Sequence, residues 1–160
     1  MIRYYKLFDL LFRRNIKLSE LRKILSSATL AKLHKGEYIS ADALDKLCEF
    51  LNCQPEDIIE HYRILEKDKH EQQLIAIKTT KEIDEYGEEI PNGIFVKSIT
   101  EPLNENGHPI SGWYEKELID NYNNLDYFAK CELDYNNALL NKNIQAKLDD
   151  LFNKADDKRA

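Results

Sequence analysis

The spacing of apolar residues changes twice along this chain, and this change limits the folds open to it more than any other feature. Apolar side chains recur at helical spacing up to about residue 62, form short alternating, threonine-rich runs between residues 74 and 113, and return to helical spacing after Trp113. Helical spacing favours amphipathic helices, and alternation favours strands. We therefore predict a helical domain at 1–62, a linker or helical extension at 63–73 and an acidic α+β domain at 74–156.

Five short helices are predicted in the first domain. Serines that can cap a helix precede three of the segments, at Ser19, Ser26 and Ser40. Gly36 stands where a left-handed glycine ends a helix, and Pro55 stands where a proline opens one, over PEDIIEHY. The longest segment carries an apolar stripe with the i, i+3, i+4, i+7 spacing of a packed helix face, made of Leu44, Leu47, Cys48 and Leu51.

The second domain is predicted to contain a three-stranded antiparallel meander followed by two or three helices packed on the sheet. Its strands are expected in LIAIKTTKEI, NGIFVKSIT and ISGWY. The two links repeat one pattern, IDEYGEEI and LNENGHPI, in which Gly87 and Gly107 supply the positive φ of a hairpin loop. We expect one apolar face on this sheet, formed by Ile75, Ile77, Phe95 and Ile99.

Charge is distributed unevenly along the chain. Residues 1–40 contain 9 basic and 3 acidic side chains, a net charge of +6, whereas residues 66–160 contain 12 basic and 20 acidic ones, a net charge of −8. A basic segment favours a polyanion as its partner, and an acidic segment favours a cationic one or simply keeps the chain soluble. Three cysteines without metal-ligand spacing suit a reducing compartment, and no apolar run is long enough to span a membrane. We predict a cytoplasmic protein.

No catalytic motif is present in the sequence. It lacks a glycine-rich phosphate loop, a GxSxG nucleophile motif and an HExxH zinc motif. His108 has no orienting partner that the sequence identifies, and His61 and His70 are too few to hold a metal. We predict that the chain is not an enzyme and has no cofactor or metal site.

Two segments carry a resemblance to a known family. Residues 25–37 read LSSATLAKLHKGE, residues 40–60 read SADALDKLCEFLNCQPEDIIE, and the opening MIRYYKLFDLLFRRN is similar to the start of small phage and plasmid members. Together they resemble the Cro/C1-type helix-turn-helix family over about 40% of the chain. The spacing departs from the family at one place: Leu21 to Ser26 is five positions instead of the usual seven, and the turn has no glycine. We therefore expect a shorter second helix or a tighter turn.

The resemblance implies a role for each residue of the basic segment. The third helix would enter the major groove of double-stranded DNA, with Ser26 at its N-cap and base contacts from Ser27 and Ala28. Lys32 would reach a guanine or a phosphate, and Thr29 a phosphate or a thymine methyl group. The remaining basic residues would contact phosphates; they are Arg13, Arg14, Lys17, Arg22, Lys23 and Lys35.

The acidic C-terminal residues leave several uses open. A face rich in carboxylates and tyrosines is expected there, made of Asp120, Tyr122, Asp126, Tyr127, Glu132, Asp134 and Tyr135. It can mediate dimerisation, sense a ligand, present carboxylates to a protein that binds nucleic acid, or be an ordinary solvated helical surface.

Two functions follow from this layout. The whole chain resembles phage and mobile-element anti-CRISPR proteins that join a helix-turn-helix domain to an acidic domain, which implies a DNA-binding autorepressor that also binds Cas9 or another basic nucleic-acid-binding protein. The alternative is a plain two-domain repressor whose second domain only dimerises or senses a ligand. Both predict a homodimer on an inverted repeat, because two recognition helices must lie about 34 Å apart on the duplex.

Overall fold

The computed structural model describes residues 1–67, 70–83 and 86–157 and divides the chain into two compact units. One unit contains Met1–Arg3 and Glu60–Ser111, and the other contains Tyr4–Ile59 and Gly112–Ala160. The predicted domains divide the chain differently, since they placed the C-terminal helices with the sheet. The structure groups these helices with the N-terminal helices, because their apolar residues pack there.

The helical unit begins with five short elements. They are α1 (Tyr5–Arg13), the 3₁₀ helix η1 (Leu18–Lys23), α2 (Ser27–His34), α3 (Ala41–Leu51) and the single 3₁₀ turn η2 (Pro55–Asp57). Leucines that the surrounding helices bury completely form its core, namely Leu7, Leu21, Leu33, Leu47 and Leu51. Each such side chain stabilises the fold by about 1.5–3 kcal/mol. The predicted helices at α1, α2 and α3 are confirmed.

The second element, η1, is a short helix, which agrees with the five-residue spacing between Leu21 and Ser26. A 3₁₀ helix completes a turn in about three residues, so Leu18–Lys23 makes two turns, and Leu25 then donates its N–H to the Leu21 carbonyl at 2.8 Å. Ser19 does not cap this helix as predicted. Glu20 does so instead, because its carboxylate accepts the Lys17 N–H at 2.9 Å.

The predicted fifth helix ends after one turn. Beyond η2 the chain forms the short strand β2 (Glu60–His61), which pairs with β1 (Ile2–Arg3), and then β3 (Arg63–Lys67). The prediction of a linker or helical extension at 63–73 is therefore wrong. Arg63 pairs with Ile75, and Ile64 pairs with Leu74, so hydrogen bonds to a partner distant in sequence outweigh the local helical preference.

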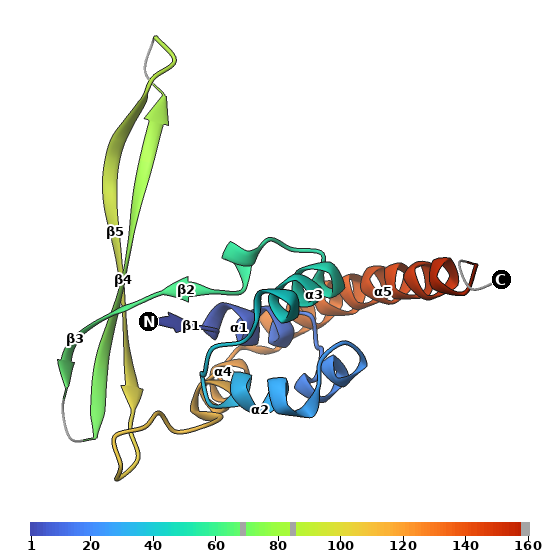
Figure 1. Ribbon diagram of the computed structural model, residues 1–160, viewed down its shortest axis with the longest axis horizontal. Coiled ribbons are helices and arrows are strands. Elements are labelled where there is room, and N and C mark those ends of the chain that lie inside the picture. The colour runs from blue at the N-terminus through green and yellow to red at the C-terminus, as the bar shows by residue number, and fades with distance from the viewer. Residues whose placement is uncertain (68–69, 84–85, 158–160) are drawn as a thin grey trace. The chain divides into compact units, whose positions relative to one another are not determined.

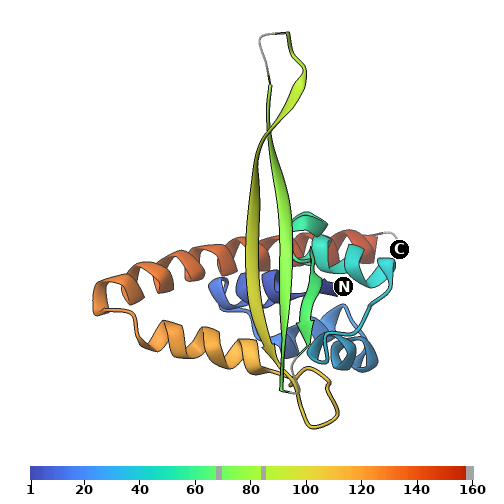
Figure 2. The ribbon, with the colours of Figure 1, turned by 90° about the vertical axis from the view of Figure 1, so that its left-hand side faces the viewer.

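The sheet unit is a three-stranded antiparallel sheet in the order β3-β4-β5, which confirms the predicted meander but not all of its strands. β4 (Glu71–Ile83) and β5 (Glu89–Pro102) form the long two-stranded ribbon in Figures 1 and 2. The predicted strand at ISGWY is absent from the described residues. The second hairpin is only an isolated bridge between Leu103 and Pro109. Gly87 and Gly107 have φ of +82° and +75°, as both loops require.

The predicted apolar face is divided between the two sides of the ribbon. Ile75 pairs with Ser98, and Leu74 pairs with Ile99, so Ile75 and Ile99 lie on opposite faces. The buried face carries Leu74 and Ala76, whereas Ile77 is 52% exposed. The side chain of Phe95 lies outside the described residues.

The C-terminal part of the helical unit contains α4 (Trp113–Asn123) and the long helix α5 (Tyr127–Asp157), which follow each other in Figure 2. The rings of Trp113 and Tyr114 pack on Tyr5, with centroids 5.7 and 4.9 Å away, and Tyr122 meets Phe12 at 5.7 Å. These aromatic contacts hold α4 against α1. No described helix is long and apolar enough to cross a membrane.

Two cysteines at the end of α3 differ from the third in their surroundings. Burial raises the pKa of Cys53 to about 11 and also raises the pKa of Cys48, whereas Cys131 is exposed. At pH 8 only about one Cys53 thiol in a thousand is then the reactive thiolate. We expect iodoacetamide to modify Cys53 at least about tenfold more slowly in the folded protein than in urea, as timed peptide mass spectrometry measures. Equal rates in the folded protein and in urea would contradict this expectation.

Candidate DNA-binding surface

Helix α2 has one buried and one exposed side. Leu30 and Leu33 are buried in the core of the helical unit and fix the helix on its inner side. Ser27, Ala28 and Lys32 are exposed on the other side. The small side chains of Ser27 and Ala28 allow another molecule to approach the first turn closely, and Lys32 lies about one turn further on.

Both ends of α2 are capped by the residues that the sequence predicts, Ser26 and Gly36. The Ser26 hydroxyl oxygen accepts the Thr29 N–H at 3.2 Å, and the hydroxyls of Ser26 and Thr29 lie 2.9 Å apart. Gly36 has φ of +67°, which lets the Glu37 N–H return to the Lys32 carbonyl at 2.9 Å. The other N–H groups of the first turn point along the helix axis and favour an anion there.

Four basic side chains on η1, on α2 and directly after it are exposed, namely Arg22, Lys23, Lys32 and Lys35. Within the described part of the chain none of them forms an ion pair. Lys17, just before η1, is exposed as well. Cations that are not neutralised by the protein's own carboxylates can attract phosphates, and this attraction weakens as salt increases.

Two of the predicted phosphate contacts have partners within the protein. Arg13 forms an ion pair with Asp9 one turn earlier in α1. The Arg14 guanidinium donates to the Leu51 carbonyl at the end of α3. Arg14 thereby satisfies a carbonyl that α3 leaves unpaired, so the structure gives it a role in holding α1 to α3.

One exposed residue near α2 was not predicted. Tyr38 lies in the loop between α2 and α3, and its side chain is 64% exposed. A large aromatic residue in the polar stretch KGEY is the signal that could have identified it. Its hydroxyl can donate a hydrogen bond to a phosphate.

Among the residues that the structure describes, only two of those predicted to form the acidic face contact each other, through a hydrogen bond. The Tyr122 hydroxyl donates to the Asp134 carboxylate at 2.8 Å, and this hydrogen bond raises the pKa of Tyr122. Asp126 accepts the Ala129 N–H at 2.9 Å and so caps α5. The remaining members do not share this contact; Tyr127 and Tyr135 are 75% and 70% exposed, and Asp120 and Glu132 are exposed.

Comparison with known proteins identifies the helical segment. Residues 6–63 match the family model of the Cro/C1-type HTH DNA-binding domain. A crystal structure of the transcriptional regulator VanUg matches with 46% sequence identity and a TM-score of 0.36, over 37% of this chain and 81% of that chain. None of the curated proteins matches the chain. Residues 6–63 therefore belong to the Cro/C1-type helix-turn-helix DNA-binding domains.

Proposed function

We propose that the chain is a repressor that binds an inverted-repeat operator, in its own promoter among others, as a homodimer. The observation that carries this proposal is the form of α2, which is anchored by Leu30 and Leu33 and exposes Ser27, Ala28 and Lys32. In this arrangement α2 enters the major groove, Ser27 and Ala28 approach base edges, and Lys32 reaches a guanine or a phosphate.

The phosphate contacts in this proposal come from the unpaired cations. Arg22, Lys23 and Lys35 are the first candidates, and Lys17 and Thr29 add to them. Arg13 and Arg14 contribute less, because Asp9 and the Leu51 carbonyl already engage them. Phosphate contacts set affinity and salt dependence, whereas the contacts of α2 with base edges set sequence preference.

Replacing two of these cations separates the two kinds of contact. Lys32→Ala should weaken operator binding and reduce the preference for operator over a scrambled duplex, because Lys32 lies on the exposed side of α2. Arg22→Ala should weaken both duplexes alike and lower the salt slope by about one. Fluorescence anisotropy at several salt concentrations measures both effects.

The matched control removes a positive charge elsewhere. Lys142 is exposed on α5, and Lys142→Ala should leave both affinities unchanged. The proposal fails if the unsubstituted protein binds operator and scrambled duplexes equally at about 0.15 M salt. The proposal that α2 enters the major groove is wrong if Lys32→Ala and Arg22→Ala both bind the operator as the original protein does.

The surface through which two copies of the chain would pair has a candidate on α5. This helix packs inward through Leu133, Asn137 and Leu148, whereas Phe128 and Tyr135 are 82% and 70% exposed. Phe128, Cys131, Tyr135 and Leu139 follow at intervals of three or four residues and so form one apolar stripe on the outer side. We propose that this stripe packs against the same stripe of a second copy, because symmetric operators need two recognition helices and an identical surface can pair with itself.

Charged substitutions in this stripe should separate the dimer. We expect Phe128→Glu combined with Tyr135→Glu to raise the dimer dissociation constant at least about 100-fold, because two carboxylates would be buried without partners. Analytical ultracentrifugation measures this change. Asn136→Glu, exposed beside the stripe on the same helix, is the control and should remain a dimer. A dimer that survives the double substitution would place the interface elsewhere.

Inhibition of Cas9 gains no support from the comparisons. In the structure, residues 66–160 are also divided between the two units, so their charges do not belong to one acidic domain. Binding of Cas9 or another basic nucleic-acid-binding protein by the acidic residues stays a prediction that cleavage assays with purified Cas9 can test.

A further inference from the structure

A cavity of about 490 Å³ lies within the helical unit, where α4 and α5 meet α1 and η1. Its apolar walls come from α1 and α4 and include Phe8, Leu11, Phe12, Leu118 and Ile119. Cavities that bind small molecules are about 300–1,000 Å³, mostly apolar, and contain a few polar groups that orient the ligand. This cavity has the size and the apolar walls of such a site.

A buried polar side chain faces this cavity. Asn137 on α5 is only 6% exposed and lines the cavity wall. Its side chain forms no hydrogen bond within the described part of the chain. The amide atoms of Asn137 are not among the fully buried polar atoms without a partner, which in the described residues belong to Arg3 and Arg14. The amide is therefore accessible from the cavity, where it can donate a hydrogen bond to, or accept one from, a polar group of a ligand.

The charges around the cavity indicate the sign of that group. Two carboxylates line it, from Glu115 and Asp134, against one cation, Lys17. Asp134 accepts a hydrogen bond from the Tyr122 hydroxyl and retains lone pairs for a second donor. Asn137 lies three residues after Asp134 and so on the neighbouring turn of α5. A ligand with a protonated amine can donate to both.

We propose that this cavity binds a lipophilic amine, with its apolar body against Phe8 and Leu118 and its ammonium group at Asp134 and Asn137. The cavity is also lined by Leu18 of η1 and by His34 in the last turn of α2. A ligand that contacts both elements can favour one orientation of α2, so its binding changes the affinity for the operator. This effect on operator affinity is the regulatory half of the proposal and rests on the proposed function, whereas ligand binding itself does not.

Three probes of one shape and different charge test the binding site. They are 4-phenylbutylamine, 4-phenylbutanol and 4-phenylbutyrate, titrated calorimetrically into the whole chain without DNA. We expect the amine to bind with a dissociation constant at least tenfold lower than that of the carboxylate, with the alcohol between them. Equal affinities for all three probes would overturn the assignment of an amine site.

Substitutions then locate the bound probe. Ile119→Trp should fill the cavity and weaken amine binding at least tenfold, whereas Leu140→Trp, at an exposed site on α5 outside both the cavity lining and the apolar stripe, should not. Asp134→Asn retains an acceptor for Tyr122 and should remove the preference for amine over alcohol. Amine binding that Ile119→Trp leaves unchanged would overturn the location.

Operator binding is measured separately, by anisotropy with and without saturating 4-phenylbutylamine. We expect operator affinity to change at least threefold, and the Ile119→Trp variant to lose this response. An unchanged affinity would overturn the regulatory half and leave the amine site in place. A chain that binds no operator even without the amine would overturn the proposed function and the regulatory half together, while the calorimetric result still decides the cavity.

Discussion

Replacing Ala28 with Glu should lower operator affinity at least about 100-fold and leave the fold intact. Ala28 is exposed on the first turn of α2, and no packing depends on its methyl group. The new carboxylate would lie where α2 approaches the groove, so it would repel phosphates on both sides and clash with base edges. Anisotropy with operator DNA measures the affinity, and circular dichroism checks the fold.

Two controls separate this repulsion from other causes. Ala28→Ser changes the side chain little in size and adds no charge, so its effect should be within about tenfold. Asn136→Glu introduces the same carboxylate at an exposed position of α5 and should leave operator binding unchanged. If Ala28→Glu binds the operator as well as the original protein, α2 is not the helix that enters the groove.

Local signals explain why the helix-turn-helix residues could be predicted from the sequence. Ser26 and Ser40 cap their helices through an N–H three residues away, at 3.2 Å in each case. Gly36 ends α2 through its own positive φ. Such interactions depend on a few neighbouring residues, so a short stretch of sequence contains all the information that they need.

The packing partners of the later elements could not be predicted in the same way. The apolar stripe of α5 shows that one side of the helix is covered, but not whether a sheet or other helices cover it. RILEK at 63–67 is equally compatible with a polar helix, and only its pairing with β4 makes it a strand. Arg14 and Arg22 are both basic residues of the same segment, and their surroundings differ only after folding.

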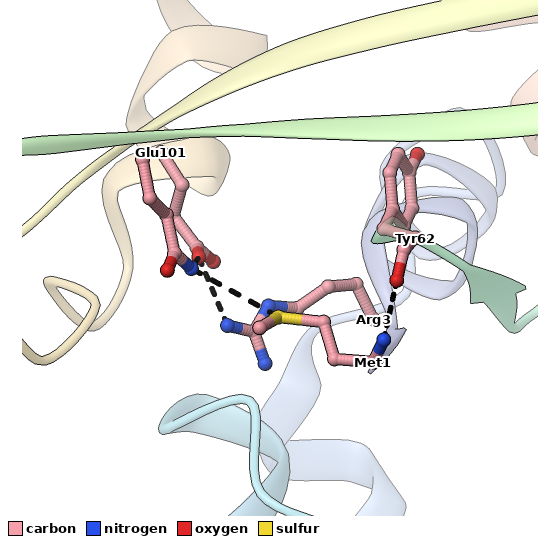
Figure 3. Close-up of polar contacts among 5 residues, drawn as sticks. Met1, Arg3, Tyr62 and Glu101 are labelled. Carbon is pink, nitrogen blue, oxygen red and sulfur yellow. Dashed lines mark hydrogen bonds and ion pairs between the residues drawn. The ribbon is translucent and has the colours of Figure 1, made fainter. Parts of the chain in front are cut away.

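The ion pair between Arg3 and Glu101 in the sheet unit joins residues 98 positions apart. The sequence could not have predicted this pair either. Arg3 donates to the Glu101 carboxylate at 2.9 Å (Figure 3). The Gln72 amide donates to the same oxygen. Glu101 and Gln72 are only 2% and 5% exposed. Beside them, the Tyr62 N–H donates to the Met1 carbonyl at 2.7 Å, so the first residues are held to the sheet unit at two points.

Replacing Glu101 with Leu should therefore destabilise the sheet unit by about 3–5 kcal/mol, because it removes the carboxylate that neutralises the buried Arg3 guanidinium. Amide hydrogen exchange at Gln72–Ala76 in β4 measures this loss, since these residues lie next to the ion pair. Glu105→Leu, in the exposed turn that follows, is the control and should change protection by less than about 0.5 kcal/mol. Exchange in α1 and α3 should stay the same, because these helices belong to the other unit. If Glu101→Leu leaves the protection of β4 unchanged, the sheet unit is held by its backbone pairing, and the buried charges contribute little to its stability.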